Sequence, residues 1–173
     1  TADTTRPVRG YFWSKNSEYI LYVQDKGGDE NFNIYAVDPS AEAGDLGVPQ
    51  ARNLTNLETV RAQILAVPDA TPNEIIVGLN DRNPQLHDVY RLNIESGERE
   101  LIRQNNEGIA GWVVDNDGKL RLGVRQTQSG GTELLRVDED ELVNVFEVDN
   151  EETLNPIRFH KNNEQLYMAT NKD

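Results

Sequence analysis

Short apolar runs recur along the chain at regular intervals and alternate with polar turns. The first series of runs begins at four positions that lie 55, 45 and 46 residues apart, namely Ile20, Ile75, Leu120 and Leu166. A second series repeats the first two intervals, 55 and 45 residues, at Ile34, Val89 and Leu134. Because two independent markers give the same intervals, the chain is predicted to consist of repeated structural units.

Each unit is predicted to contain four β-strands. An aromatic or apolar strand comes first, at residues 10–13, 63–67, 110–114 and 157–159. A turn rich in Asn, Asp, Gly and Pro then leads to the buried apolar strand. A polar hairpin follows, then the third strand, and a weaker fourth strand is expected at 52–55, 99–104 and 143–148. Four strands in about 45 residues is the size of one β-propeller blade.

The sequence therefore predicts an all-β fold, a β-propeller fragment of about three four-stranded blades plus half of a fourth. The expected blades span residues 8–60, 61–106 and 107–153, with an incomplete blade at 154–173, so that residues 1–173 form one partial propeller domain. Because an autonomous propeller needs several blades to close, we expect the chain to be part of a larger protein, cut at both ends. Open sheet edges pair readily with other strands, so self-association through the cut propeller edges is a further expectation.

Two segments depart from the simple repeat. Residues 39–50 are rich in Gly, Pro and small residues, and a loop insertion of about ten residues there would explain the long first interval. Residues 56–66 carry a competing helical signal, because Thr55–Glu58 is a capping-box pattern and apolar residues follow it at roughly helical spacing. The repeat register instead favours a strand near residues 62–67, with a helical turn allowed at 56–60.

Composition narrows the possible functions. The 30 acidic and 17 basic residues give a net charge of −13, and such an acidic surface repels nucleic acid and anionic membranes. No apolar run is long enough to span a bilayer. The absence of cysteine excludes disulfides and thiolate zinc sites, but it does not decide between a cytoplasmic and a periplasmic location for a soluble protein. We therefore expect no nucleic-acid partner, no membrane partner and no cofactor.

Distinctive hairpin and strand-end sequences occur at residues 13–14, 19–31, 34–38, 53–55, 80–90 and 130–135. These segments resemble the N-terminal propeller of prolyl-oligopeptidase-family serine peptidases, in particular dipeptidyl-peptidase and acylaminoacyl-peptidase-like members. Such peptidases carry an α/β-hydrolase domain after the propeller, with the catalytic Ser in a Gly-x-Ser-x-Gly elbow, followed by Asp and His. The resemblance implies a propeller that gates the access of short peptides to this domain and docks onto it.

No residue of the chain fits the catalytic triad of that family. None of the five serines has Gly both two positions before and two positions after it, and the two histidines lie in a hairpin and near a strand end. The catalytic α/β-hydrolase domain is therefore expected to be absent, and the chain would not hydrolyse peptides by itself. The alternative interpretation is a TolB-like or WD-repeat-like propeller scaffold that binds a protein partner, with no peptidase attached.

The hairpins between second and third strands are expected to emerge on one face of the propeller and to carry the candidate site residues. Those predicted to face the substrate or the hydrolase domain are Glu30, Arg82, Asp29, Asn31, Asp81 and Arg125. The resemblance implies that a carboxylate there pairs with the α-ammonium group of a peptide and that an Arg binds a carbonyl or carboxylate group. The alternative is a set of solvated hairpin tips with turn-stabilising side chains, in which Asp29 or Glu30 pairs with Lys26 or Arg82.

No catalytic residue and no metal site is predicted. Residues 138–141 are typical of a solvated acidic turn. The Asp115–Gly118 segment lacks the first and twelfth ligands of a calcium-binding loop. His87 and His160 lie in different units, without paired ligand spacing. Trp13 and Trp112 occupy equivalent first strands and are expected to pack between blades.

Overall fold

The chain folds into antiparallel sheets that follow one another along the sequence. The computed structural model describes residues 3, 5–139 and 141–172, and within these residues it contains fourteen β-strands and no helix. The first sheet consists of β1 (Tyr11–Trp13), β2 (Ile20–Gln24), β3 (Asn33–Val37) and β4 (Arg52–Asn53). The second consists of β5 (Ala62–Ala66), β6 (Glu74–Asn83), β7 (Leu86–Asn93) and β8 (Arg99–Arg103).

The last two sheets continue the same order. The third consists of β9 (Gly111–Val114), β10 (Leu120–Gln126), β11 (Thr132–Asp138) and β12 (Glu141–Val148). The fourth contains β13 (Leu154–Phe159) and β14 (Leu166–Thr170). Each strand pairs with its neighbour in sequence, so every four-stranded sheet is a simple meander. The all-β fold and its four-strand repeat are thus confirmed.

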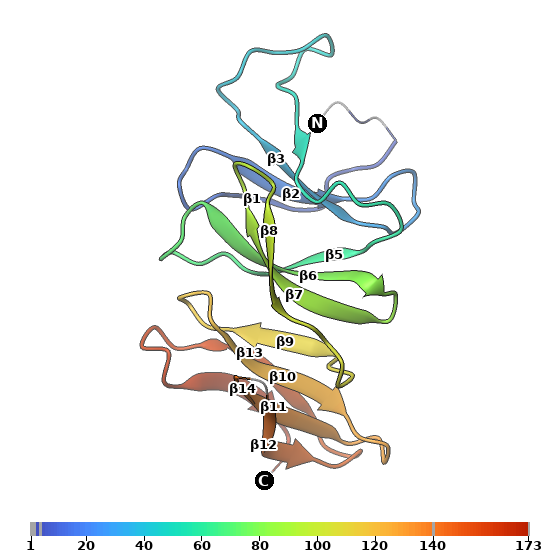
Figure 1. Cartoon of the computed structure of the whole chain (residues 1–173), viewed down its shortest axis with the longest axis vertical. Helices are drawn as coiled ribbons and strands as arrows, with labels where there is room; N and C mark the ends of the chain where they lie inside the picture. Colours follow the sequence, from blue (N-terminus) through green and yellow to red (C-terminus); the bar gives the residue numbers. More distant parts are fainter. Residues whose placement is uncertain (1–2, 4, 140, 173) are drawn as a thin grey trace.

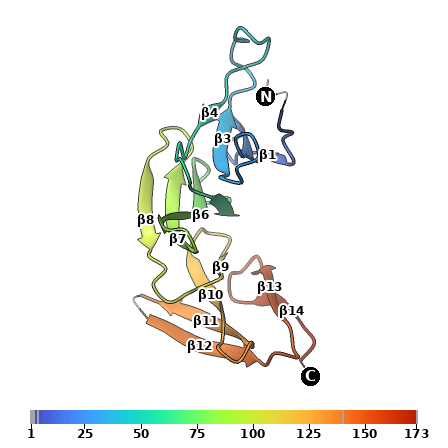
Figure 2. The same ribbon diagram turned by 90° about the vertical axis from the view of Figure 1, so that its right-hand side faces the viewer.

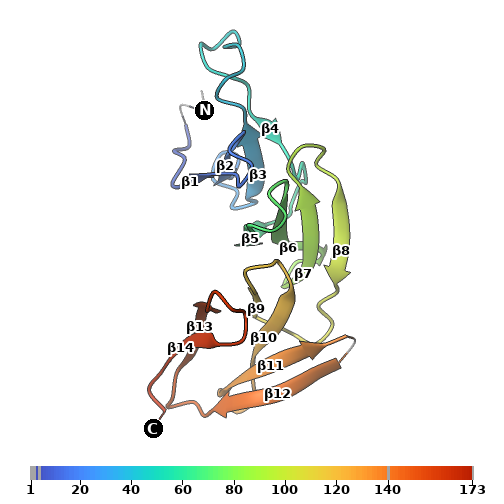
Figure 3. The ribbon, with the colours of Figure 1, turned by 90° about the vertical axis from the view of Figure 1, so that its left-hand side faces the viewer.

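The four sheets stack in sequence order to form a curved body (Figure 1). The two side views show β1 and β13 toward the concave side of this body, and β8 and β12 along the convex side (Figures 2 and 3). This arrangement is the one expected when the first strand of each blade lies near a propeller axis and the fourth lies outside.

Apolar side chains fill the spaces between neighbouring sheets. Alternate residues of a strand point to opposite faces, so a sheet with neighbours on both sides buries both sets. Leu21 and Ile34 of the first sheet pack with Ile75 and Leu92 of the second, and all four are fully buried. Burying each of these side chains contributes about 1.5–3 kcal/mol. Separate clusters join the second sheet to the third and the third to the fourth.

The segment between the first and second sheets contains no helical turn, so that part of the expectation is wrong. Asn56 and Thr59 have φ values of 44° and 58°, in the left-handed region, which a right-handed helix cannot accommodate. The Asn53 Oδ1 atom accepts a hydrogen bond from the Asn56 backbone amide at 2.8 Å, and Asn33 Oδ1 accepts one from the Leu57 amide at 3.0 Å. Side-chain acceptors of this kind compete with helical hydrogen bonding, and the register prediction of a strand near 62–67 is confirmed by β5.

The two tryptophans have different environments. Trp112 is only 9% exposed and packs between the second and third sheets, as expected. Trp13 is 54% exposed and its neighbour Tyr11 is 71% exposed, so the expectation of inter-blade packing is wrong for Trp13. The reason is that, among the described residues, no sheet packs against this side of the first sheet (Figure 1).

The insertion at residues 39–50 forms an arm that projects from the first sheet, at the top of Figure 1. A single β-bridge between Ala43 and Pro49 closes its tip, where Leu46 is 76% exposed. In the described part of the chain, no helix is long and apolar enough to cross a membrane.

Candidate functional site

The three hairpins that join second to third strands emerge on the same side of the stack, to the right in Figure 1. They connect β2 to β3, β6 to β7 and β10 to β11. The six candidate residues lie in or beside these hairpins. Among the described residues, the hydrogen-bond and ion-pair partners of these six residues lie in the same hairpin or in the segment that follows the same sheet.

The first hairpin is organised by its own acidic side chains. The Asp29 Oδ1 atom accepts hydrogen bonds from the backbone amides of Lys26 and Asn31, which makes Asp29 a turn-forming residue. Glu30 is exposed and its φ is 60°, while its backbone amide donates to Asp25. Within the described residues, the Glu30 carboxylate has no hydrogen bond or ion pair, so it remains available to a ligand.

The Asp25 carboxylate at the end of β2 anchors the segment that precedes β1. The Arg6 guanidinium donates two parallel hydrogen bonds to it, with Nε–Oδ1 and Nη2–Oδ2 distances of 2.9 and 2.8 Å. Bidentate pairs of this kind are strong and geometrically specific. The hydrogen bonds from Arg6 hold the pKa of Asp25 below its ordinary value. The Gln24 side-chain amide also donates to the Arg6 carbonyl oxygen at 2.7 Å, so the last residue of β2 and the residue after it both hold this segment.

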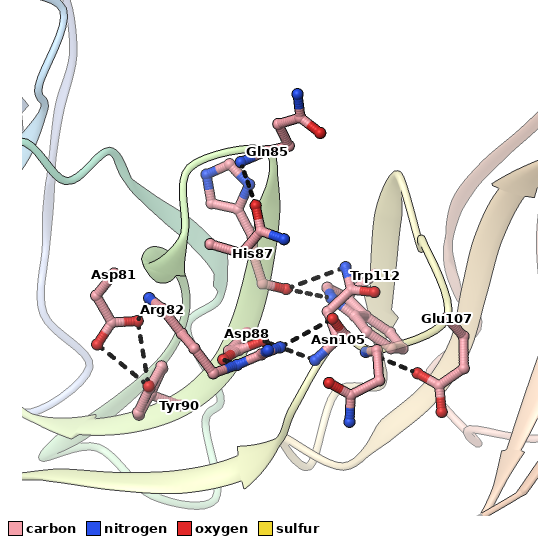
Figure 4. A network of polar contacts seen from close by, with 11 residues as sticks. Asp81, Arg82, Gln85, His87, Asp88, Tyr90, Asn105, Glu107 and Trp112 are labelled. Atoms are coloured by element: carbon pink, nitrogen blue, oxygen red, sulfur yellow. Dashed lines mark hydrogen bonds and ion pairs between the residues drawn. The ribbon is translucent and has the colours of Figure 1, made fainter.

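A second bidentate pair lies in the second sheet, as Figure 4 shows. The Arg82 guanidinium donates to both oxygens of Asp88 at 2.8 and 2.9 Å, and its Nη2 also donates to the Asn105 carbonyl oxygen at 2.9 Å. Asp88 is 1% exposed. Burial by itself would raise the pKa of Asp88, but hydrogen bonds from Arg82 and from the Asn105 amide lower it. Arg82 therefore pairs with Asp88, and not with Asp29 or Glu30.

Asn105 stabilises the linker between the second and third sheets through hydrogen bonds. This residue is fully buried, its Oδ1 accepts the Ile109 amide at 2.9 Å, and its Nδ2 donates to the Ile109 carbonyl oxygen at 2.7 Å. Its backbone amide donates to Asp88 Oδ1 at 2.6 Å. Trp112 adds a contact from the third sheet, because its indole Nε1 donates to the His87 carbonyl oxygen at 2.9 Å (Figure 4). These hydrogen bonds therefore connect the second sheet to the third.

The same position of the repeat is polar in the first three sheets, and it supplies a linker contact in the first two. Asn33, Asp88 and Glu133 each precede by one residue the buried marker of the third strand. Asn33 accepts hydrogen bonds from the Thr55 hydroxyl and the Leu57 amide in the linker after the first sheet. Glu133 pairs with Arg125 at 2.8 Å and accepts a bond from Asn144 of β12. The sequence analysis missed this role, although alignment of the repeats would have revealed the shared polar position.

The other two candidates interact inside their own hairpins. The Tyr90 hydroxyl donates to the Asp81 carboxylate at 3.2 Å, and Arg125 is held by Glu133. Among the residues that the structure describes, no group of three or more His, Asp or Glu side chains is arranged to hold a metal ion. Burial lowers the pKa of His87, so this imidazole is neutral at pH 7.

Comparisons with known proteins identify the relatives of this chain. No protein-family model matches it. Dipeptidyl aminopeptidase BIII from Pseudoxanthomonas mexicana is 41% identical over 136 residues, which are 79% of this chain and 19% of that protein. This chain is a homologue of the dipeptidyl peptidases. Dipeptidyl peptidase family member 6 from Caenorhabditis elegans is 32% identical over 130 residues, which are 75% of this chain and 17% of that protein.

Solved structures agree on the fold of this dipeptidyl-peptidase homologue. Prolyl oligopeptidase B from Galerina marginata superimposes with a TM-score of 0.60 at 10% identity, over 95% of this chain and 22% of that protein. TolB from Acinetobacter baumannii gives a TM-score of 0.50 at 15% identity, over 94% of this chain and 40% of that protein. The resemblance expected from the hairpin sequences is confirmed, and the chain spans less than a quarter of the peptidases that it matches.

Proposed function

We propose that this chain is a non-catalytic propeller segment of a prolyl-oligopeptidase-family serine peptidase, where it gates peptide access and docks the α/β-hydrolase domain. The observation that carries the proposal is the 41% identity to dipeptidyl aminopeptidase BIII over 136 residues. We also propose the blade limits 8–60, 61–106, 107–153 and 154–173. They are supported by the sheets, since each sheet lies inside one of these ranges.

The sequence supports a non-catalytic role for the chain by itself. A hydrolase of this class needs a serine on a sharp turn between a strand and a helix, with glycines that permit the tight backbone. None of the five serines has glycines at both required positions. Ser14, which is buried, follows β1 in a turn, where its hydroxyl oxygen accepts a hydrogen bond from the Tyr19 backbone amide.

The arrangement of the sheets supports a gating role. A gate must hold its opening at a fixed size, and the linkers between blades are held by part-buried hydrogen bonds at Asn33 and buried ones at Asn105. The hairpins of the first three sheets emerge on one side (Figure 1), which gives a single surface for contact with a second domain or a substrate. On that surface Glu30 offers an unpaired carboxylate, the group that attracts a peptide α-ammonium.

The experiment uses the longer protein that carries this chain. We expect it to hydrolyse dipeptidyl p-nitroanilides, whereas the 173-residue chain alone does not. Glu30→Gln should raise KM about tenfold, because one charge-assisted contact is lost. The matched control is Glu98→Gln, an exposed glutamate of the β7–β8 turn, and it should leave KM unchanged within twofold.

Three results would refute parts of this proposal. Hydrolysis by the 173-residue chain would refute the non-catalytic assignment. A longer protein with no peptidase activity and no Gly-x-Ser-x-Gly elbow would favour the scaffold interpretation. Equal effects of the Glu30 and Glu98 substitutions would remove Glu30 from the substrate site. The likeness to TolB concerns the fold alone, so the scaffold function has no independent support.

A further inference from the structure

Three arginines gather at the inner end of the first two sheets, although the chain as a whole carries a net charge of −13. Arg6 and Arg9 precede β1, and Arg61 precedes β5. Asp25 neutralises Arg6 through the bidentate pair described above. Arg9 and Arg61 are exposed, and in the described part of the chain neither guanidinium forms an ion pair with a carboxylate. Arg9 and Arg61 therefore each carry a positive charge that is not paired with a carboxylate of the described residues.

A hollow of about 570 Å³ lies beside these arginines. It is formed where the segment before β1 meets the end of β2 and the middle of β5. Its charged and polar lining comes from Arg6, Arg9, Gln24 and Asp25. Its apolar lining comes from Pro7, Tyr11, Phe12, Val23, Phe32 and Ile64. A volume of this size suits a ligand of one or two amino-acid residues, since small-ligand sites span roughly 300–1,000 Å³.

Arg9 and Arg61, the two of these three arginines that form no ion pair among the described residues, are both associated with the hollow. Phe32 lines the hollow, and the Arg61 guanidinium lies over its ring at 5.6 Å from the centroid. Arg9 lines the hollow itself, on the same chain segment as Tyr11. A cation–π contact holds Arg61 in place without neutralising its charge. The hollow thus has apolar walls, the guanidinium group of Arg9 in its lining, and that of Arg61 beside it against Phe32.

The charges in and beside the lining indicate which class of ligand the hollow can bind. The Asp25 carboxylate and the Arg6 guanidinium cancel, and Arg6 keeps the pKa of Asp25 low, so this pair stays ionised and neutral in sum. Arg9 adds one positive charge inside the hollow and Arg61 another beside it. Guanidinium groups bind carboxylates in a planar, bidentate manner, and the aromatic walls favour an apolar group next to that carboxylate.

We propose that this hollow binds a peptide carboxylate that lies next to an apolar side chain, with Arg9 and Arg61 as the binding residues. The inference that the carboxylate belongs to a peptide rests on the proposed function, whereas the inference that the hollow binds a carboxylate next to an apolar group does not. Both the C-terminal carboxylate of a peptide and an acidic side chain supply this chemistry. Two residues of β1 line the hollow, and β1 lies toward the concave side of the body in Figures 2 and 3.

The test is a calorimetric titration of the 173-residue chain with three blocked peptides. N-acetyl-Ala-Phe has a free C-terminal carboxylate, N-acetyl-Ala-Phe amide has none, and N-acetyl-Phe-Glu amide has only the side-chain carboxylate. We expect the free acid to bind about tenfold more tightly than its amide. Binding of the glutamyl amide with a similar Kd to the free acid would identify an acidic side chain as a sufficient source.

Substitutions then locate the binding site. Arg9→Gln and Arg61→Gln should each weaken binding of the acid about tenfold, and Arg9→Lys should have a smaller effect because it keeps the charge but loses the bidentate geometry. The matched control is Arg99→Gln on β8, an exposed arginine for which no acidic partner is described, and its Kd should stay within twofold of the original. All three positions are exposed, and circular dichroism verifies the fold of each of the four variants.

The proposal is overturned if no carboxylate peptide binds with a Kd below about 10 mM, if acid and amide bind equally, or if Arg9→Gln acts no differently from Arg99→Gln. These outcomes are separable from failure of the proposed function, because the titration involves no hydrolysis. Peptidase activity in the longer protein without carboxylate binding would refute this site alone. Carboxylate binding in a longer protein without peptidase activity would refute the peptidase assignment alone.

Discussion

Asn105 offers a quantitative test of how the blades are held together. Replacing it by Ala removes the two side-chain hydrogen bonds to the backbone of Ile109 and leaves the bond from its own amide to Asp88 in place. Ile109 is 3% exposed, so water cannot easily replace the lost partner of its amide and carbonyl groups. Removing one partner of a hydrogen bond so that the other stays buried and unpaired costs about 1–2 kcal/mol for each of the two bonds. We therefore expect Asn105→Ala to lower the free energy of unfolding by roughly 2–4 kcal/mol.

Urea denaturation followed by tryptophan fluorescence measures this loss. Trp112 is a suitable reporter because it packs between the second and third sheets and donates to His87, next to the substituted linker. With a slope of about 2 kcal/mol per molar urea, the expected loss moves the midpoint down by roughly 1–2 M.

The neighbouring residue provides the matched control. Asn106 is exposed, and among the described residues its side chain forms no hydrogen bond. Asn106→Ala should therefore change the free energy of unfolding by less than about 0.5 kcal/mol. The reasoning is refuted if the two variants have the same midpoint, or if Asn105→Ala loses less than about 1 kcal/mol.

Three further predictions concern stability. Asp88 has a lowered pKa in the folded state, so its stabilising effect is present above the unfolded value near 3.8 and is lost as pH falls through the folded pKa. Asp88→Asn should flatten the pH dependence of the urea midpoint below pH 4, and an unchanged slope would contradict this. Gly131→Ala should destabilise the chain by more than about 1 kcal/mol, since a Cβ there would lie 2.4 Å from the Val148 carbonyl oxygen. Gly10→Ala, with no atom within 4 Å of its Cβ, is the control, and equal thermal midpoints would be the contrary result. Leu21→Ala should cost about 2–5 kcal/mol, because this side chain is fully buried between the first two sheets, and a loss below about 1 kcal/mol in urea denaturation would contradict that packing.

The sequence predicted most of the strand layout because strand formation here follows a local, periodic pattern. The runs that begin at Ile20, Ile75, Leu120 and Leu166 each correspond to a second strand of a sheet. Residues 56–66 carry both a helical signal and the repeat register of a strand, and the register correctly predicted the strand. The allowed helical turn at 56–60 was wrong, because its amides bind side chains instead: Asn56 binds the nearby Asn53, and Leu57 binds Asn33, which is 24 residues away in the sequence.

Less of the candidate site than of the fold could be predicted from the sequence. Arg82 and Arg125 were placed in the correct hairpins, but hairpin position does not reveal whether a charged side chain is free or paired. Arg82 is held by Asp88 and Arg125 by Glu133, whereas Glu30 remains unpaired within the described residues. Whether these residues contact a substrate stays a prediction.

By itself, the sequence determined the all-β class, the four-strand repeat and the relationship to dipeptidyl peptidases, since each of these depends on residue order along one strand or hairpin. Only the tertiary structure decided that Asn105 holds the linker between two sheets, and that Arg9 and Phe32 line one hollow with Arg61 packed against Phe32. These groups come from separate segments, and their juxtaposition depends on how the sheets stack. Ion pairing and burial depend on that spatial arrangement, which residue spacing does not encode.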